Sequence, residues 1–186
     1  GQDAVTACLD EVERRKCKRV AIITSPSLRK ATGSADALAK ALGKSVAFIF
    51  DDLHPHTPSP QVDAFAREIK EARADLVVSM GGGTPIDTAK VALALNCDDG
   101  EASLLLAGMA PKDKPPPIRQ IACPTTLSGA EFSDLAGLTD PETRIKHGIA
   151  SFGIGPASVI LDASLAAHTP LDLWLSTGMR AVDHAI

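Results

Sequence analysis

The sequence of 186 residues is long enough for one full domain and part of a second, and 45% of its residues are hydrophobic, which excludes global disorder. A formal net charge of −4 argues against a nucleic-acid partner, and an aromatic content of 3% argues against a base-stacking surface. The sequence has no signal peptide and no apolar run long enough to span a bilayer, so we expect no membrane partner.

The first half of the chain predicts alternating helices and strands. The predicted elements are, in chain order, an amphipathic helix that starts at Val5, a strand over 19–25, a helix over 35–42 that Gly43 ends, a strand over 45–50, a proline-rich loop over 51–60, a helix over 62–73 and a strand over 76–80.

The second half continues this alternation and adds a hairpin. The predicted elements are a helix over 89–95, a surface connection over 112–117, a strand over 120–123, a β-hairpin with strands over 135–139 and 144–149, a strand over 158–161 and a helix over 171–186. Strands that alternate with helices of this length predict an α/β fold, with a mostly parallel, Rossmann-like sheet and helices on both faces.

The four cysteines indicate a reducing compartment. Cys8, Cys17, Cys97 and Cys123 show no C-x-x-C spacing. We expect them to be reduced and mostly buried thiols in a cytoplasmic protein.

The stretch 81–90, GGGTPIDTAK, is the strongest signal for a binding site. It lies between a predicted strand and a predicted helix, an arrangement that places backbone N–H groups and a positive helix end against a phosphate. The glycines remove every Cβ where a pyrophosphate must approach the backbone. Thr84 suits the helix cap, Pro85 suits the first helical position, and Asp87 and Lys90 project from one side. A tight turn without a ligand is the alternative.

Three further loops follow predicted strands, over 24–28, 51–60 and 124–133. Because the carboxyl ends of parallel strands form one edge, ligands bind there and the loops should meet. The Pro124-Thr125-Thr126 hydroxyls can bind a ribose or the edge of a base, or they can be satisfied within a turn.

The last predicted helix carries a second group of polar residues. Arg180 and His184 are four residues apart and share one face of the helix. A single His on a helix is more often structural than catalytic, so this pair alone does not define a site.

Together these segments resemble the iron-containing alcohol dehydrogenase family, which includes the maleylacetate reductases. The family signature GGG[ST]xxDxAK is matched in full at 81–90, its PTT segment is matched at 124–126, and Thr177-Gly178-Met179 matches the opening of its metal-site helix. Lys146, the run 156–162 with Leu165, and Pro170 follow in the expected order. The variants at 56–58 (HTP) and 127–132 (LSGAEF) look most like the maleylacetate reductase branch.

The resemblance implies a nucleotide-binding, Rossmann-like domain over 1–168 and the beginning of an all-helical domain over 169–186, with the active site in the cleft between them. The sequence opens without Met and stops at Ile186 inside a helical pattern. We therefore expect a fragment of a longer chain.

The resemblance also implies hydride transfer with NAD or NADP and assigns cofactor-binding residues. Gly82, Gly83 and Thr84 would hold the pyrophosphate. Ser25 stands where many NAD-preferring members have an acidic residue, which leaves NADP open because a serine does not repel a 2′-phosphate. The other implied cofactor contacts are Asp87, Thr125 and Thr126 at the nicotinamide half, Lys146 near its ribose, Leu165 against the ribose or ring, and His56 and Ser128 beside the cofactor.

Arg180 departs from the family pattern, because metal-dependent members have Asp at this position. A guanidinium is always protonated and cannot ligate a cation, so we expect no complete metal site in this chain. Arg180 could instead grip a substrate carboxylate and stabilise an enolate, while His184 positions the substrate or relays a proton. We therefore predict a nicotinamide-dependent reductase for a small, carboxylated substrate of the maleylacetate type. The resemblance is compatible with a homodimer.

Three alternatives stay open at this point. A metal-dependent alcohol dehydrogenase, with iron or zinc, could tolerate Arg180 by using other ligands. A lyase similar to dehydroquinate synthase would share the fold and the cofactor. A non-catalytic fragment would bind the cofactor without turning over a substrate.

Overall fold

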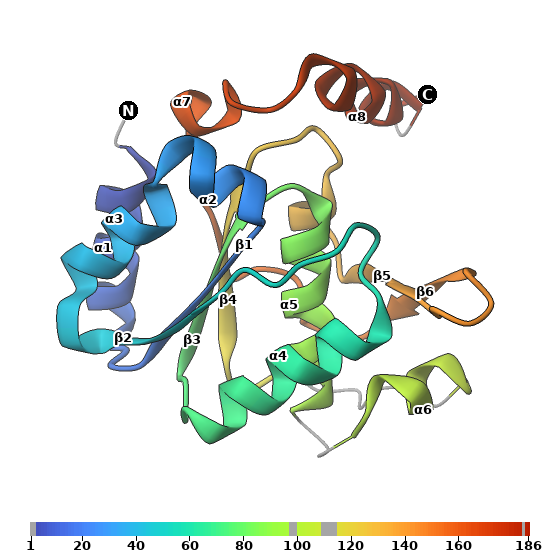
Figure 1. The fold of residues 1–186 in the computed structure, drawn as a ribbon, viewed down its shortest axis with the longest axis horizontal. Helices are drawn as coiled ribbons and strands as arrows, with labels where there is room; N and C mark the ends of the chain where they lie inside the picture. The colour runs from blue at the N-terminus through green and yellow to red at the C-terminus, as the bar shows by residue number, and fades with distance from the viewer. Residues whose placement is uncertain (1–2, 97–99, 109–114, 184) are drawn as a thin grey trace.

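A five-stranded parallel sheet forms the centre of the computed structural model, which describes residues 3–96, 100–108, 115–183 and 185–186 (Figure 1). The strand order is β2-β1-β3-β4-β7, and every neighbouring pair is parallel. The predicted α/β fold is confirmed. The strand bounds are β1 Val20–Thr24, β2 Val46–Phe50, β3 Leu76–Gly81, β4 Arg119–Pro124 and β7 Ser158–Val159.

Helices cover both faces of the sheet, as the alternating pattern predicts (Figure 1). Side chains of α1, α2 and α3 form one buried cluster with the strands, and side chains of α4, α5 and α6 form another. The helix bounds are α1 Ala4–Arg15, α2 Pro26–Thr32, α3 Ser34–Leu42, α4 Ser59–Glu71, α5 Gly83–Leu95, α6 Ala102–Leu106, α7 Ala163–Ala166 and α8 Leu171–Asp183, with short 3₁₀ turns η1 Gly43–Ser45 and η2 Ala130–Phe132.

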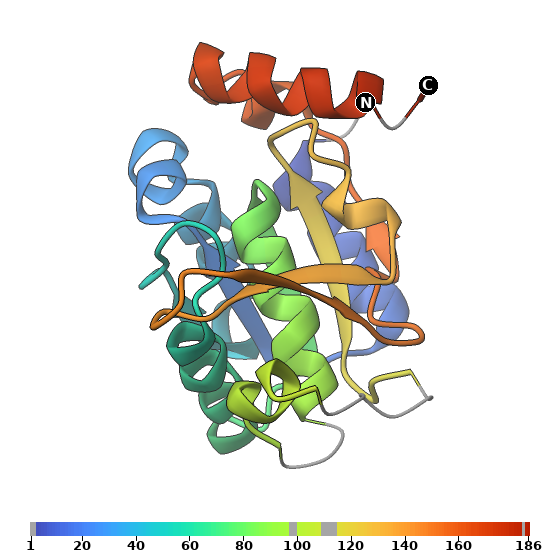
Figure 2. The ribbon, with the colours of Figure 1, turned by 90° about the vertical axis from the view of Figure 1, so that its right-hand side faces the viewer.

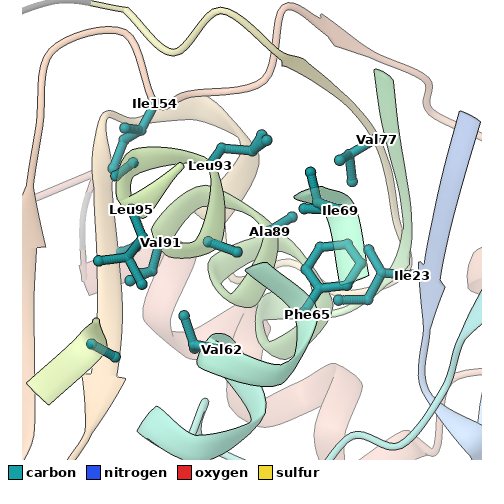
Figure 3. Packing of buried hydrophobic residues seen from close by; sticks show 14 of the residues in the cluster. Ile23, Val62, Phe65, Ile69, Val77, Ala89, Val91, Leu93, Leu95 and Ile154 are labelled. Atoms are coloured by element: carbon teal, nitrogen blue, oxygen red, sulfur yellow. The ribbon is translucent and has the colours of Figure 1, made fainter. Parts of the chain in front are cut away.

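Helix α5 is buried on all sides from Pro85 to Leu95. One side packs on the sheet and on α4, where Phe65 and Ile69 lie beside Ala89 (Figure 3). A helix enclosed in this way needs apolar residues around most of its circumference, and the run VALAL (91–95) satisfies that requirement. The buried Asp87 and Lys90 of the same helix have polar partners in the segment that leads into β5 and in β5 itself.

A two-stranded antiparallel hairpin of β5 (Leu135–Thr139) and β6 (Lys146–Ala150) covers the opposite side of α5. Figure 2 shows the hairpin crossing in front of α5. Ala136, Leu138 and Ile149 enter the same buried cluster as α5, because alternate residues of each strand point to one face. The predicted hairpin is therefore confirmed, with a second strand that begins two residues later and ends one residue later than predicted.

Helix α8 lies across the carboxyl ends of the strands (Figure 1). None of its described residues is buried. Two contacts hold the segment to the end of β4: the Thr169 hydroxyl donates to the Thr125 carbonyl at 2.6 Å, and Leu127 N–H donates to the Thr177 hydroxyl at 3.2 Å.

Several predicted boundaries are wrong. The helix predicted over 89–95 begins at Gly83, and the strand predicted over 158–161 includes only 158–159. Helices α2, α6 and α7 were not predicted, because each spans only four to seven residues and carries too few apolar positions to show a period. Half of the predicted connection over 112–117, residues 112–114, lies outside the described residues.

The cysteines in the described part of the chain are free thiols, as predicted. Cys8 in α1 and Cys123 in β4 are fully buried with their Sγ atoms 3.5 Å apart, and Cys17 is half-buried. Cys97 lies outside the described residues. Among the helices that the structure describes, we find none long and apolar enough to pass through a lipid bilayer.

Candidate functional site

Four loops meet at the carboxyl edge of the sheet, around the glycine turn Gly81–Thr84. Thr125 N–H donates to the Gly81 carbonyl at 2.9 Å, which fixes the loop after β4 beside the turn. From the loop after β2, His56 N–H donates to the Thr84 hydroxyl at 3.3 Å. The predicted meeting of these loops at one edge of the sheet is confirmed, and ligand binding there stays a prediction.

The three glycines of this turn serve different purposes. A Cβ on Gly81 would lie 2.7 Å from Pro85 Cγ, and Gly81 also has a φ of +141°, which side chains rarely adopt. A Cβ on Gly82 would lie 2.9 Å from Thr126 Cγ2. On Gly83 the nearest atom would be Ser128 Oγ at 3.5 Å, an ordinary contact. Packing within the chain thus explains the first two glycines but not the third.

The N-terminus of α5 has no side-chain cap among the described residues. Gly82 is the N-cap, so Thr84 and Pro85 occupy the second and third helical positions. The predictions of a Thr84 cap and of Pro85 at the first position are wrong, because the extended backbone of Gly82 already ends the strand. Uncapped amide groups at a helix N-terminus, together with the helix dipole, favour an anion.

The neighbouring helix α2 begins at the same edge but is capped. The Ser25 hydroxyl accepts from Leu28 N–H at 3.3 Å and lies 3.2 Å from the Ser27 hydroxyl. Pro26, at the first position of α2, contributes no N–H. In α5 the N–H groups of Gly83 and Thr84 have no side-chain cap among the described residues, and Pro85 contributes no N–H.

The two threonines after β4 are nearly buried beside the glycine turn. The Thr126 hydroxyl lies 3.2 Å from the Ser128 hydroxyl. The Thr125 carbonyl is occupied by Thr169. The structure thus brings Thr125, Thr126 and Ser128 together with Gly82 and Gly83, as predicted.

Asp87 lies one turn further along α5 and is 8% exposed. Its Oδ2 accepts from Gly137 N–H of β5 at 3.0 Å, whereas its Oδ1 has no hydrogen-bond partner among the described residues. Burial raises the pKa of Asp87, and the Gly137 N–H and the positive charges of Lys90, Lys146 and Arg180 partly offset that rise. An unpartnered buried carboxylate oxygen beside a predicted ligand site is a natural ligand contact.

Lys90, fully buried, holds the segment that leads into β5. Its ammonium donates to the carbonyls of Ala130, Ser133 (2.8 Å) and Leu135 (2.9 Å). Burial lowers the pKa of Lys90, while the nearby carboxylates, Asp87 first, oppose that change. The Lys of the GGGTPIDTAK stretch is therefore committed to the fold, a role that the sequence did not show.

The loop 54–58 reaches the site through two consecutive residues in the left-handed region, His56 (φ 68°) and Thr57 (φ 56°). Thr139 of β5 holds both: its hydroxyl donates to the His56 carbonyl at 2.5 Å and its N–H donates to the Thr57 carbonyl at 2.9 Å. Sequence reasoning missed Thr139, because its partner His56 is 83 residues away. The His56 side chain is exposed at the mouth of the site.

Three predicted residues lie at the margin of this cluster. Lys146 is exposed on β6, and its side chain lies over Gly137. Arg180 is exposed on α8, close enough for its charge to lower the pKa of Asp87. Leu165 of α7 is buried in the cluster beneath α1, so its contact with a cofactor stays a prediction. His184 lies outside the described residues.

Within the described ranges, no group of three or more His, Cys, Asp or Glu side chains could hold a metal ion. Two hollows of about 460 Å³ have no residue of the glycine turn in their lining, one lined by Asp51, His54 and Glu68 and the other by Asp63, Arg67 and Asn96. Neither contains a predicted site residue, so we place the candidate site at the glycine turn.

Comparison with known proteins identifies the family of the chain. A family model described as iron-containing alcohol dehydrogenase matches residues 1–163. Dehydrogenase FUM7 of Gibberella moniliformis is 34% identical over 195 residues, which is 97% of this chain and 46% of that protein. The maleylacetate reductase of Rhizobium sp. is 31% identical over 185 residues, which is 100% of this chain and 46% of the relative.

Solved structures show the same architecture. The sulfoacetaldehyde reductase from Bifidobacterium kashiwanohense, solved in complex with NAD+, superposes with a TM-score of 0.87 and 28% identity, over 97% of this chain and 48% of the other. This chain spans slightly less than half the length of these relatives. The family match over residues 1–163, the sheet order and the shared signature at 81–90 lead to one conclusion: the chain belongs to the iron-containing alcohol dehydrogenase family.

Proposed function

We propose that this chain forms the dinucleotide-binding part of an oxidoreductase that uses NAD or NADP. The observation that carries the proposal is the N-terminus of α5, which has no side-chain cap and begins with Gly83, a glycine that packing within the chain does not require. A pyrophosphate fits both features, since it needs free amide donors and close approach to the backbone. Gly82, Gly83 and Thr84 would hold it.

The residues around the second turn of α5 suit the nicotinamide half. The Asp87 Oδ1 atom lacks a partner among the described residues, and Thr125 and Thr126 are held beside the glycine turn. When bound, the nicotinamide ring supplies or accepts the hydride. The role of the protein is to orient that ring with Asp87 and the threonines, with His56, Ser128 and Lys146 at its border.

The choice between NAD and NADP would be made near Ser25. Ser25 carries no charge to repel a 2′-phosphate, but the nearest cation of α2, Arg29, is already paired with Asp36 at 2.6 Å and Asp51 at 2.8 Å. Binding of a 2′-phosphate by Arg29 would therefore compete with two carboxylates. Titration with both reduced nucleotides decides which one binds.

We further propose a substrate with a carboxylate next to an activated double bond, of the maleylacetate type. The positive charges of Lys146 and Arg180 both act on Asp87, so they converge on the nicotinamide side of the site. Hydride addition to the activated C=C bond places negative charge on the conjugated carbonyl oxygen, which the Arg180 guanidinium would stabilise. His184 would position the substrate or relay the proton that completes the reduction.

The described residues do not fit the metal that the family name implies. Arg180 stands where the resemblance places an Asp ligand, and the described part of the chain offers no group of ligands. We therefore derive no step through a metal. Stoichiometric iron or zinc that is required for turnover would contradict the proposed role of Arg180.

The division after residue 168, a homodimer and a cytoplasmic location stay proposals. The absence of buried residues from the described part of α8 supports the boundary, because that helix adds nothing to either buried cluster. The free thiols Cys8, Cys17 and Cys123 support a reducing compartment. Light scattering on the full-length protein measures its oligomeric state.

The test of the function uses the full-length protein. Nicotinamide fluorescence is titrated with NADH and NADPH, and turnover is then followed with maleylacetate, with metal content measured on the same sample. We expect micromolar-range binding of at least one nucleotide, on the order of 1–100 μM, and loss of turnover in Arg180→Ala with nucleotide binding retained. No binding of either nucleotide would overturn the proposal.

A further inference from the structure

In the hairpin, two glycines lie directly opposite each other, so this part of the hairpin has no side chains of its own. Gly137 of β5 pairs directly with Gly148 of β6, and the next pair on the same face is Thr139 with Lys146. The Lys146 side chain is exposed, but it does not extend straight out from its own pair. Its aliphatic part crosses diagonally and lies over Gly137.

A side chain at Gly137 would occupy the same space as Lys146. An ideal Cβ there would overlap Lys146 Cε and lie 2.6 Å from Nζ and 3.2 Å from Cδ. Real Cβ atoms do not approach other atoms so closely. The lysine can therefore take this path only because residue 137 has no side chain.

The backbone of Gly137 also holds the acidic partner of this region. Its N–H donates to Asp87 Oδ2 at 3.0 Å, and the end of the Lys146 side chain lies over its Cα. The same residue therefore contacts both the Asp87 carboxylate and the Lys146 side chain. The Lys146 charge also lowers the pKa of Asp87, without a direct ion pair between the two side chains. The two charged groups thus reach the nicotinamide half of the proposed cofactor site through one glycine.

Backbone conformation does not explain the glycine. Gly137 lies in a regular strand and is not among the residues with positive φ. The backbone at this position therefore accepts any residue that suits a strand. The three nearest atoms that a Cβ would meet belong to the flexible end of Lys146, which can swing away at small cost.

We propose that Gly137 is a positioning residue that seats the Lys146 ammonium beside Asp87, and that any larger residue there turns the ammonium away from the cofactor. This inference rests on the proposed function, since it takes the nicotinamide half of a dinucleotide as the ligand of Lys146.

The experiment measures the Kd of NADH, or of NADPH if it binds more tightly, in the full-length protein and four variants. These are Gly137→Ala, Lys146→Met, the double variant Gly137→Ala/Lys146→Met, and the control Gly148→Ala. Gly148 is the direct cross-strand partner, and a Cβ there would meet only Leu135 Cδ1 at an ordinary 3.6 Å. Thermal unfolding of each variant confirms that the fold is retained.

We expect Lys146→Met and Gly137→Ala each to raise the Kd about tenfold, the scale of one lost charged hydrogen bond. The double variant should be no weaker than Lys146→Met alone, because both changes remove one interaction. Gly148→Ala should stay within about twofold of the wild type. A purely structural role for Gly137 would instead give losses that multiply in the double variant.

The outcomes separate this inference from the proposed function. If Lys146→Met weakens binding but Gly137→Ala does not, or if their effects multiply, the positioning role is wrong and the cofactor site stands. If Lys146→Met leaves the Kd unchanged, Lys146 does not contact the nucleotide and the positioning role of Gly137 is wrong. The proposal that the glycine turn binds the nucleotide is then unaffected. If the wild type binds neither nucleotide, both proposals are overturned.

Discussion

The first two turns of α5 belong to one short sequence motif but differ in their hydrogen bonding. At the glycine turn, no side chain in the described part of the chain caps the amide groups of Gly83 and Thr84. One turn later, Asp87 and Lys90 are buried and bonded to the free edge of β5. The comparison teaches that one motif contains residues with two different roles, some at the candidate ligand site and others in the attachment of a hairpin. Only the geometry of the folded chain shows which residue has which role.

The largest expected effect tests the attachment. Lys90→Met leaves the carbonyls of Ala130, Ser133 and Leu135 without their buried donor. We expect a loss of about 3–5 kcal/mol in the free energy of unfolding, the usual cost of breaking a buried charged network. Urea denaturation measures it, with Lys40→Met on the exposed face of α3 as the matched control. A loss below about 1 kcal/mol would show that Lys90 is not committed to the fold.

The second prediction tests the glycine turn. Gly83→Ala should fold with unchanged or slightly greater stability, since Ala favours a helix by up to about 1 kcal/mol. Its methyl group would stand where the pyrophosphate approaches, so nucleotide affinity should fall at least about tenfold. Gly82→Ala is the contrast: its Cβ would strike Thr126, and we expect about 1–3 kcal/mol of lost stability. Normal nucleotide affinity in Gly83→Ala would contradict the proposal that a pyrophosphate binds at the start of α5.

A third prediction concerns the loop that joins the two regions. Thr139→Val removes the hydroxyl that donates to the His56 carbonyl but keeps the shape and the N–H. We expect about 1 kcal/mol of lost stability and a nucleotide Kd raised a few-fold, because the left-handed turn at His56 and Thr57 loses one anchor. Thr139→Ser keeps the hydroxyl and should behave like the wild type. Equal losses in both variants would point to the methyl group instead.

The smallest expected effect is a pH dependence at Asp87. Its pKa is raised by burial, so the folded state binds the proton more tightly than the unfolded state. Stability contributed by the protonated carboxyl is present at acid pH and is lost as the pH rises through the folded-state pKa. Asp87→Asn keeps an acceptor for Gly137 N–H and cannot ionise. Thermal unfolding midpoints should therefore favour the wild type relative to Asp87→Asn at acid pH, and parallel curves would contradict the shift.

The fold could be predicted because its main elements are encoded locally. The apolar run Leu76–Met80 followed by three glycines predicts a buried strand and a turn, and alternation over 135–139 predicts a hairpin strand. The start of α5 was misplaced, because Thr84 and Pro85 look like cap residues although the backbone of Gly82 already serves that purpose. The backbone conformation of Gly82, rather than the cap preference of Thr84 and Pro85, therefore sets the start of α5.

The candidate site was predicted only as far as its residues belong to loops after strands. That Gly82, Thr126 and Ser128 lie together was predictable because parallel strands end at one edge, whereas their contacts with a cofactor come from the family resemblance and stay a prediction. The uses of Lys90, Gly137 and Thr139 depend on partners 45, 50 and 83 residues away, respectively. No spacing in the sequence encodes such contacts, so they could be found only from the folded structure.

The bonded edge of β5 also has a consequence for self-association. A free strand edge is a template for pairing with another chain, and proteins need ways to block it. Here Leu135, Gly137 and Thr139 present their edge groups to Lys90, Asp87 and Thr57, so this edge is already paired. Removing the charged side chains of α5 would therefore do more than weaken the fold. It would release a β edge beside exposed Leu135, and the protein would tend to aggregate rather than refold.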